Sequence, residues 1–263
     1  MIIIGEKINC TRSEIADACE KKDKEKIASI AKAQADAGAA YIDVNNGIAG
    51  KELETMEWLL TVVQDAVDVP VAIDTSHVES LKKALEMVDK KPIINSISAE
   101  KERYESFLPV IDGKNCGVVA LCMSDSGTPT GIEDRVRTTD FLVEKITGAG
   151  IGIDDIYVDP CVLPASSAPE SGQHFIESIR KIKEKYKGIH VTGGLSNVSY
   201  GLPRRQMLNR TFMAMCISAG MDTAIANPMD NKFTATVLAA EALIGLDDYC
   251  MNFVTAEREG KLD

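Results

Sequence analysis

Eight short apolar runs, each followed by a segment with helical periodicity, divide the 263 residues of the chain into repeated units. The runs are rich in β-branched residues and span 1–5, 41–44, 71–74, 92–96, 117–122, 156–159, 189–193 and 223–227. Strand-like runs that alternate with helices are typical of β-α units, which build a parallel sheet. The sequence therefore predicts an α/β protein with eight parallel strands.

The segments between the runs carry helix signals of their own. Ile27, Ile30 and Ala31 share one helical face after Asp23, which can cap the helix, and Gly38 can end it. Further helices are expected near 53–63, 78–88, 134–146, 175–186, 204–219 and 234–245. A helix is thus named after every predicted strand except the one at 92–96.

Eight strand–helix units without a low-complexity linker favour a (β/α)8 TIM barrel, formed by a single domain over residues 1–263. An open doubly wound sheet is the alternative. It would place a phosphate-binding G-x-G-x-x-G motif after the first strand, where this chain has GEKINC.

Charge and cysteine usage exclude several classes of protein. A formal net charge of −11 disfavours nucleic acid or an anionic membrane as a partner, because such binders need a basic surface. The first residues, MIIIGEKIN, lack the features of a secretory signal. The seven cysteines are scattered without a C-x-x-C motif, so they indicate neither a disulfide framework nor a zinc ribbon. We expect a cytoplasmic protein.

Polar side chains follow the strands at the end where TIM barrels carry their active sites. They are mostly Asp, Asn and Ser: Glu6, Asn9, Asp43, Asn45, Asn46, Asp74, Asn95, Ser98, Asp125, Asp159, Ser196, Asn197 and Asn227, with Met123 after the fifth strand. Any one of them alone is more often a helix cap or a turn residue, and Asp43 best fits such a structural role. Capping does not require so many to converge, so together they predict a ligand site.

The residue types at this predicted site indicate the chemistry of its ligand. None of the three histidines has zinc-ligand spacing, so no metal site is predicted, although Mg²⁺ on the carboxylates stays an alternative if the substrate is phosphorylated. No lysine ends a strand, and no G-x-S-x-G or P-loop occurs. Carboxylates that accept and amides that donate and accept suit a flat heteroaromatic ring, such as a pterin or a purine.

Six segments together resemble one family. They are GEKIN (5–9), DVNNG (43–47), IDTS (73–76), INSIS (94–98), DPCVLP (159–164) and GLSNVSYGLPRRQMLNRTF (194–212). The chain, from Met1 to about Thr255, resembles the pterin-binding methyltransferases typified by methyltetrahydrofolate:corrinoid/iron-sulfur protein methyltransferase. It is more distantly similar to the folate domain of cobalamin-dependent methionine synthase and to dihydropteroate synthase.

The resemblance implies a dihydropteroate-synthase-like, pterin-binding barrel that binds tetrahydrofolate or 5-methyltetrahydrofolate as its substrate and works as a homodimer. By motif match, Asp74, Asn95 and Asp159 would hold the pyrimidine edge of the pterin, and Asn197 would approach N5, which carries the transferred methyl group. Arg205 matches an arginine that helps bind the folate; a solvated surface charge is the equal alternative. Asp43, Met123 and Ser196 complete the predicted pocket, and Gly193 and Gly194 would leave room for the ring.

The implied reaction moves a methyl group between N5 and the cobalt of a corrinoid. The cobalamin would come on a partner protein, because the chain lacks the D-x-H-x-x-G motif of corrinoid-binding modules. One segment departs from the family: SYGLPR (199–204) replaces a typically polar stretch, which leaves the identity of the corrinoid protein open.

Two other functions stay open at this point. The first is a dihydropteroate synthase-like enzyme. The segment GEKINCTR argues against it, because that family usually has N-x-T-P-D-S-F after the first strand. The second is a non-catalytic folate-binding barrel, which would keep Asp74, Asn95 and Asp159 but would not need Asn197.

Overall fold

The computed structural model describes residues 1–262, and its eight strands form one parallel sheet in the order β7-β6-β5-β4-β3-β2-β1-β8. The strands are β1 (Ile2–Asn9), β2 (Tyr41–Asn45), β3 (Val71–Asp74), β4 (Ile93–Ala99), β5 (Gly117–Ser124), β6 (Ile156–Asp159), β7 (His190–Val191) and β8 (Thr223–Ala226). Because β1 pairs with both β2 and β8, the sheet curls into a barrel. Within the described residues its hydrogen-bond ladder is open only between β7 and β8.

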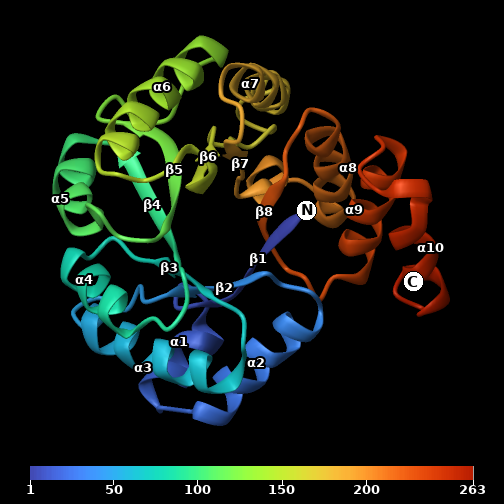
Figure 1. Ribbon diagram of the computed structural model, residues 1–263. Coiled ribbons are helices and arrows are strands. Elements are labelled where there is room, and N and C mark those ends of the chain that lie inside the picture. The colour runs from blue at the N-terminus through green and yellow to red at the C-terminus, as the bar shows by residue number, and fades with distance from the viewer. Residues whose placement is uncertain (263) are drawn as a thin grey trace.

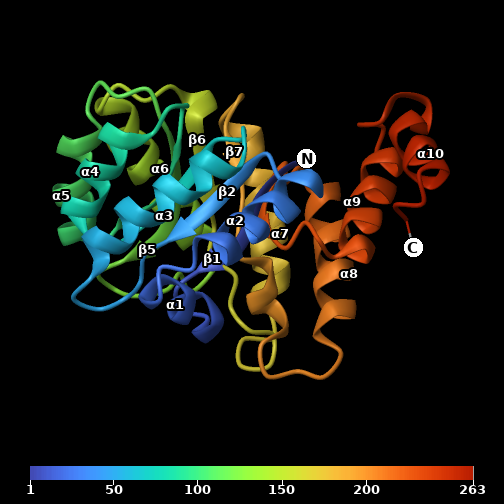
Figure 2. The same cartoon turned by 90° about the horizontal axis from the view of Figure 1, so that it is seen from below.

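Helices surround the strands on all sides (Figure 1). They are α1 (Ser13–Glu20), α2 (Lys24–Asp36), α3 (Glu52–Ala66), α4 (Val78–Met87), α5 (Lys101–Ile111), α6 (Ile132–Gly148), α7 (Ser171–Lys185), α8 (Arg205–Ser218), α9 (Asn231–Leu243) and α10 (Met251–Arg258). The α10 helix lies beside α9 at the outer edge of the molecule in both views (Figures 1 and 2). The predicted TIM barrel is confirmed.

Most predicted boundaries agree with the structure to within a few residues. The strands at 71–74 and 156–159 match, and Asp23 caps α2 by accepting a 3.1 Å hydrogen bond from the Lys26 N–H. The strand expected at 189–193 is wrong in length, since β7 covers only His190–Val191 and a 3-10 turn follows at Leu195–Ser199. The sequence analysis also named no helix at α1, α5 or α10. Of these, α1 and α10 are only eight residues each and too short for a clear period.

The barrel interior has an apolar layer covered by a polar one. Ile4, Ala72, Ile93, Val119 and Tyr157 form the apolar layer, which belongs to five different strands. Side chains alternate along a strand, so the residue two positions further on points into the barrel as well. Those positions hold Glu6, Asp74, Asn95, Leu121 and Asp159. The alternation of side chains therefore places mostly polar residues directly below the mouth of the barrel.

Candidate active site

Four side chains of neighbouring strands β2, β3 and β4 join in one network at the barrel mouth. The Asn95 amide donates to Asp43 Oδ1 at 3.1 Å, and the Asn45 amide donates to Asp74 Oδ2 at 2.9 Å. Strand register places Asn45 beside Asp74 and Asp74 beside Asn95. The structure thus brings three of the predicted site residues, Asp43, Asp74 and Asn95, into contact.

The two carboxyl groups of this network interact, and burial raises the pKa of both. Burial raises the pKa of Asp43 well above its usual value, and the negative charge of Asp74 raises it further, while the bond from Asn95 lowers it. Burial also raises the pKa of Asp74, but bonds from Asn45 and Asp43 oppose this shift. Asp43 is therefore the member of the pair that takes up a proton first as the pH falls, and once protonated it donates to Asp74.

A pocket of about 290 Å³ opens above this pair and is lined by Asn45, Asp74, Asn95 and Arg103, among others. Asp43 itself is only 2% exposed and does not line it. The guanidinium of Arg103 donates to the Thr75 carbonyl at 3.2 Å, and its charge lowers the pKa of Asp74. The sequence reading missed Arg103 because it lies on a helix rather than at a strand end.

Asp159 ends β6 and is tied to two loops. Its Oδ1 accepts from the Cys161 N–H at 2.8 Å, and its carboxylate also accepts from the backbone of Gly194. Burial raises the pKa of Asp159 to about 6, against the effect of these two bonds and of the Arg135 charge. The carboxylate is thus poised to titrate near neutral pH.

Asn197 lies in the 3-10 turn that follows β7, with Ser196 beside it and both side chains exposed. The turn is closed by the Asn197 N–H, which donates to the Gly194 carbonyl at 3.1 Å. The side-chain amide of Asn197 makes no hydrogen bond to another residue in the range 1–262, so it is available to a ligand. Met123, half-buried, ends β5 between Asn95 and Asp159 in strand order.

The room left by the two glycines before this turn is filled by the protein itself. A Cβ at Gly193 would lie 2.9 Å from the Phe175 ring and 3.3 Å from Asp159 Oδ1, and one at Gly194 would lie 3.2 Å from Asn197 Nδ2. The expectation that these glycines make room for a flat ligand is therefore corrected. They let Phe175, Asp159 and Asn197 pack against the turn.

Arg205, in the first turn of α8, braces the same loop. Its Nη2 donates to the Ser196 carbonyl at 2.8 Å and its Nε donates to Ser199 Oγ at 3.1 Å. Its guanidinium also lies 5.9 Å from the Tyr200 ring centre. These bonds show that Arg205 is more than a solvated charge; contact with folate stays a prediction.

Within residues 1–262, no group of three or more His, Cys, Asp or Glu side chains is arranged to hold a metal ion. No helix described there is long and apolar enough to span a membrane.

A (β/α)8 barrel with acceptors and donors at its mouth is a class of enzyme scaffold that holds heteroaromatic ligands. The family model described as "Pterin binding enzyme" matches residues 5–227, and the chain belongs to this family.

The relatives of the chain are consistent with that family. It is 37% identical over 265 residues to the methylcorrinoid:tetrahydrofolate methyltransferase of Eubacterium limosum, covering 100% of this chain and 98% of the relative. It is 28% identical over 241 residues to the methionine synthase of Mycobacterium tuberculosis, covering 86% of this chain but only 20% of that longer protein.

A solved structure shows the same fold. A dihydropteroate synthase from Coxiella burnetii, in complex with pteroic acid, superposes with a TM-score of 0.67 over 94% of this chain and 92% of the other, at 12% identity.

Proposed function

We propose that the protein transfers a methyl group between N5 of tetrahydrofolate and the cobalt of a corrinoid that a partner protein carries. The observation that carries the proposal is the 37% identity to a methylcorrinoid:tetrahydrofolate methyltransferase, which extends over essentially both whole chains. The site geometry supports it. The exposed amide of Asn197 lies in the turn that follows Gly194, whose backbone N–H donates to Asp159, and Asp159 belongs to a polar layer suited to a pterin.

The polar layer would hold the pyrimidine edge of the pterin. Carboxylates accept from the ring N–H and amino groups, which gives this role to Asp74 and Asp159, while the amide of Asn95 can both donate and accept. Asp43, being buried and bonded to Asn95, would act behind them by orienting Asn95 and Asp74. The half-buried Met123 would contact the flat face of the ring.

Asn197 would assist the methyl transfer itself. The reaction is an SN2 displacement in which the N5 amine leaves poorly unless it gains a proton or a hydrogen bond as its bond to carbon breaks. An amide N–H that bonds N5 more tightly as charge develops stabilises the transition state more than the ground state. In the reverse direction N5 must be free to attack, and a neutral amide can turn its oxygen or move aside.

The corrinoid partner would approach the open mouth of the barrel. Tyr200 and Met207, 64% and 62% exposed, lie in the loop and helix turn that follow Asn197 and would face it. Tyr200 lies in SYGLPR (199–204), the segment that departs from the polar stretch typical of the family that the chain resembles. The homodimer and the cytoplasmic location remain predictions; sedimentation at several concentrations would test the first.

The decisive experiment mixes the protein with 5-methyltetrahydrofolate and reduced free cobalamin and follows the absorbance of methylcobalamin. The reverse mixture, methylcobalamin with tetrahydrofolate, tests the other direction. We expect methyl transfer that depends on the protein. Folate binding without transfer, repeated with a corrinoid protein, would instead indicate a non-catalytic folate-binding barrel. Condensation of a pterin pyrophosphate with p-aminobenzoate would indicate dihydropteroate synthase.

A further inference from the structure

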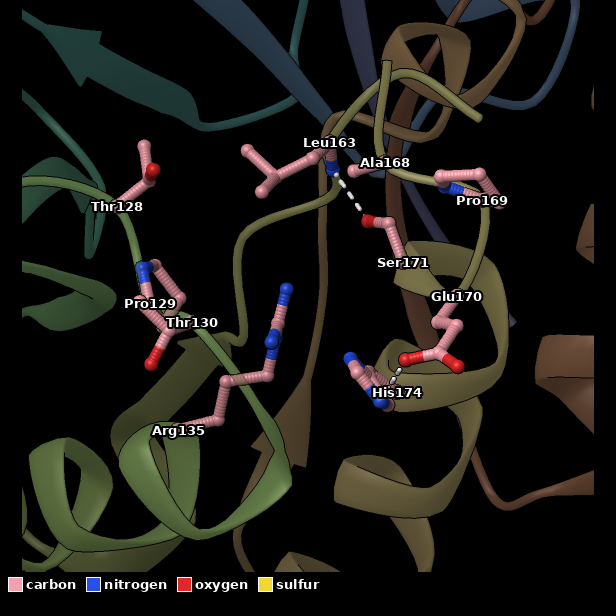
Figure 3. Close-up of a pocket in the computed structure, with 10 residues that line it drawn as sticks. All are labelled: Thr128, Pro129, Thr130, Arg135, Leu163, Ala168, Pro169, Glu170, Ser171 and His174. Carbon is pink, nitrogen blue, oxygen red and sulfur yellow. Dashed lines mark hydrogen bonds and ion pairs between the residues drawn. The ribbon is translucent and has the colours of Figure 1, made fainter. Parts of the chain in front are cut away.

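A buried arginine lies directly behind Asp159. Arg135, in the first turn of α6, is 1% exposed and is the largest of the fully buried side chains. Figure 3 shows it rising from α6 between the β5–α6 connection, at Thr128–Thr130, and the β6–α7 connection, at Leu163–Ser171. These segments also line a pocket of about 530 Å³, with Arg135 at its base.

The guanidinium of Arg135 is held by backbone carbonyls. Its Nε donates to the Pro160 carbonyl at 2.7 Å, Nη2 to the Cys161 carbonyl at 3.0 Å, and Nη1 to the Gly131 carbonyl at 3.1 Å. It forms no ion pair within the described part of the chain. Burial lowers the pKa of Arg135, while nearby negative charges, including Asp159, oppose this. A buried cation is unfavourable unless such partners compensate it, so this geometry indicates a specific role.

The carbonyls that Arg135 binds belong to the turn that orients Asp159. Cys161 has a φ of +65°, a conformation that side-chain-bearing residues rarely adopt. In that conformation its N–H reaches back to Asp159 Oδ1 at 2.8 Å. Arg135 fixes the peptide groups on both sides of Cys161 Cα, so the guanidinium, the turn and the carboxylate form one unit.

We propose that Arg135 is a positioning residue for pterin binding, which holds the Pro160–Cys161 turn and thereby directs the Asp159 carboxylate at the pterin. The proposal rests on the proposed function, in which Asp159 binds the pterin. Arg135 does not touch the ligand, because its donors face backbone carbonyls and its side chain is 1% exposed. The guanidinium presents several N–H donors in fixed directions, so it can bind the carbonyls of Pro160, Cys161 and Gly131 at once. The single ammonium group of a lysine cannot donate in all three of these directions.

Arg135→Lys tests the geometry while keeping the charge. We expect the affinity for tetrahydrofolate, measured by calorimetry, to fall roughly tenfold, because small displacements of a binding group have large effects. The rate of a single turnover at saturating folate should change by less than about threefold, since Asp159 binds ground and transition states alike. The matched control is Arg137→Gln, whose side chain is 77% exposed and should leave both values unchanged.

A double-mutant cycle tests whether Arg135 acts through Asp159. In an Asp159→Asn background, Arg135→Lys should weaken folate binding no further. The proposal is overturned if Arg135→Lys binds folate like the control, or if its effect is the same size with and without the Asp159 carboxylate.

A second pair of variants disturbs the turn without touching Arg135, in case its substitutions fail to fold. Cys161→Val puts a β-branched residue at the positive φ and should weaken folate binding as Arg135→Lys does. Cys161→Ala removes the thiol but keeps an unbranched side chain, and should bind nearly as the unaltered protein does. Equal affinities for the two variants would contradict a role for the turn.

One measurement stays informative if the proposed function is wrong. In the folate-free protein, ¹³C NMR of the Asp159 carboxyl should show its pKa rise above about 6 in Arg135→Gln, because the opposing cation is lost. Failure of the unaltered protein to bind any folate would refute the proposed function alone. An unchanged Asp159 titration would refute the coupling between Arg135 and Asp159.

Discussion

At the scale of single residues, the proposed site separates groups expected to face the ligand from groups expected to support them. Asp74 and Asn95 line the pocket, and Asn197 is exposed. The carboxylate of Asp159 is anchored by the backbone N–H of Cys161. Asp43 is buried behind them, and burial raises its pKa. Substitution of a ligand-facing residue should therefore change the reaction rate or the folate affinity directly. Substitution of a supporting residue should change them only by displacing its neighbours.

Asn197→Ala should slow methyl transfer by about 100-fold, since one hydrogen-bond donor aimed at developing charge contributes about 3 kcal/mol. Folate affinity should change much less, because the bond to N5 is strongest in the transition state. Single-turnover rates and a folate titration measure the two effects, with the neighbouring Ser196→Ala as control. A turnover rate near that of the unaltered protein would show that the assigned role is wrong.

Folate binding should depend on pH through Asp159, because only the ionised carboxylate accepts from the pterin N–H groups. Since the pKa of Asp159 is about 6, affinity should be level above that pH and fall about tenfold per pH unit below it. Asp159→Asn should weaken binding and flatten this profile. Asp68→Asn, with a side chain 99% exposed, is the control. A profile unchanged by Asp159→Asn would contradict the assignment.

The same raised pKa affects folding stability. A carboxyl whose pKa rises on folding stabilises the fold below its usual pKa of 3.8, and this contribution is lost as the pH rises through about 6. The free energy of unfolding, relative to that of Asp159→Asn, should therefore drop by roughly 2 kcal/mol between pH 4 and pH 8. Urea titrations of both proteins at each pH measure the difference, and an increase in this interval would contradict the burial of Asp159.

At the scale of elements, the site depends on how the loop after β7 packs against α7 and β6. Gly193 lets the Phe175 ring of α7 and the Asp159 carboxylate of β6 approach the loop backbone. The loop thereby connects the end of the site that we propose binds the pterin to Asn197. A change at this contact should disturb both functions together.

Gly193→Ala should destabilise the protein by about 1–3 kcal/mol, because its Cβ would lie only 2.9 Å from the Phe175 ring. It should also weaken folate binding by displacing Asp159. The control is Gly148→Ala at the end of α6, where an added Cβ meets nothing within 4 Å. Thermal unfolding and folate titration check both effects; equal stability of the two variants would mean that the loop can move aside freely.

At the scale of the whole molecule, the barrel is closed unevenly. Strands β4 and β5 are long and paired on both sides, whereas β7 has two residues and no ladder to β8 in the described structure. Local opening should therefore concentrate at this seam, where the Asn197 loop lies.

Amide hydrogen exchange should be at least about tenfold faster in β7 and residues 192–199 than in the centre of β5, because unpaired edges open locally. Folate should slow exchange at the seam, since a ligand that binds the closed form stabilises it. Mass spectrometry of peptides from both regions measures this. Uniform protection around the barrel would contradict a weak seam.

The sequence by itself determined the barrel and the residue types of its mouth, because both follow from local periodicity: strands alternate with a period of two, and polar residues fall at their ends. The family motifs likewise lie within short segments of chain. The partner of Asp43, the raised pKa values of Asp43 and Asp74, and the contacts of Arg103 and Arg135 were decided only by the tertiary structure. Asn95 and Asp43 are 52 residues apart, and Arg135 and Pro160 are 25 apart.

Arg135 does carry one local signal: it lies in the same helical phase as the buried Thr139, Leu142, Val143 and Ile146. That phase predicts burial but names no partner. Which carbonyls meet the guanidinium, and which carboxyl takes up a proton first, depends on distances across the closed barrel, and the pattern along the chain contains no such distances.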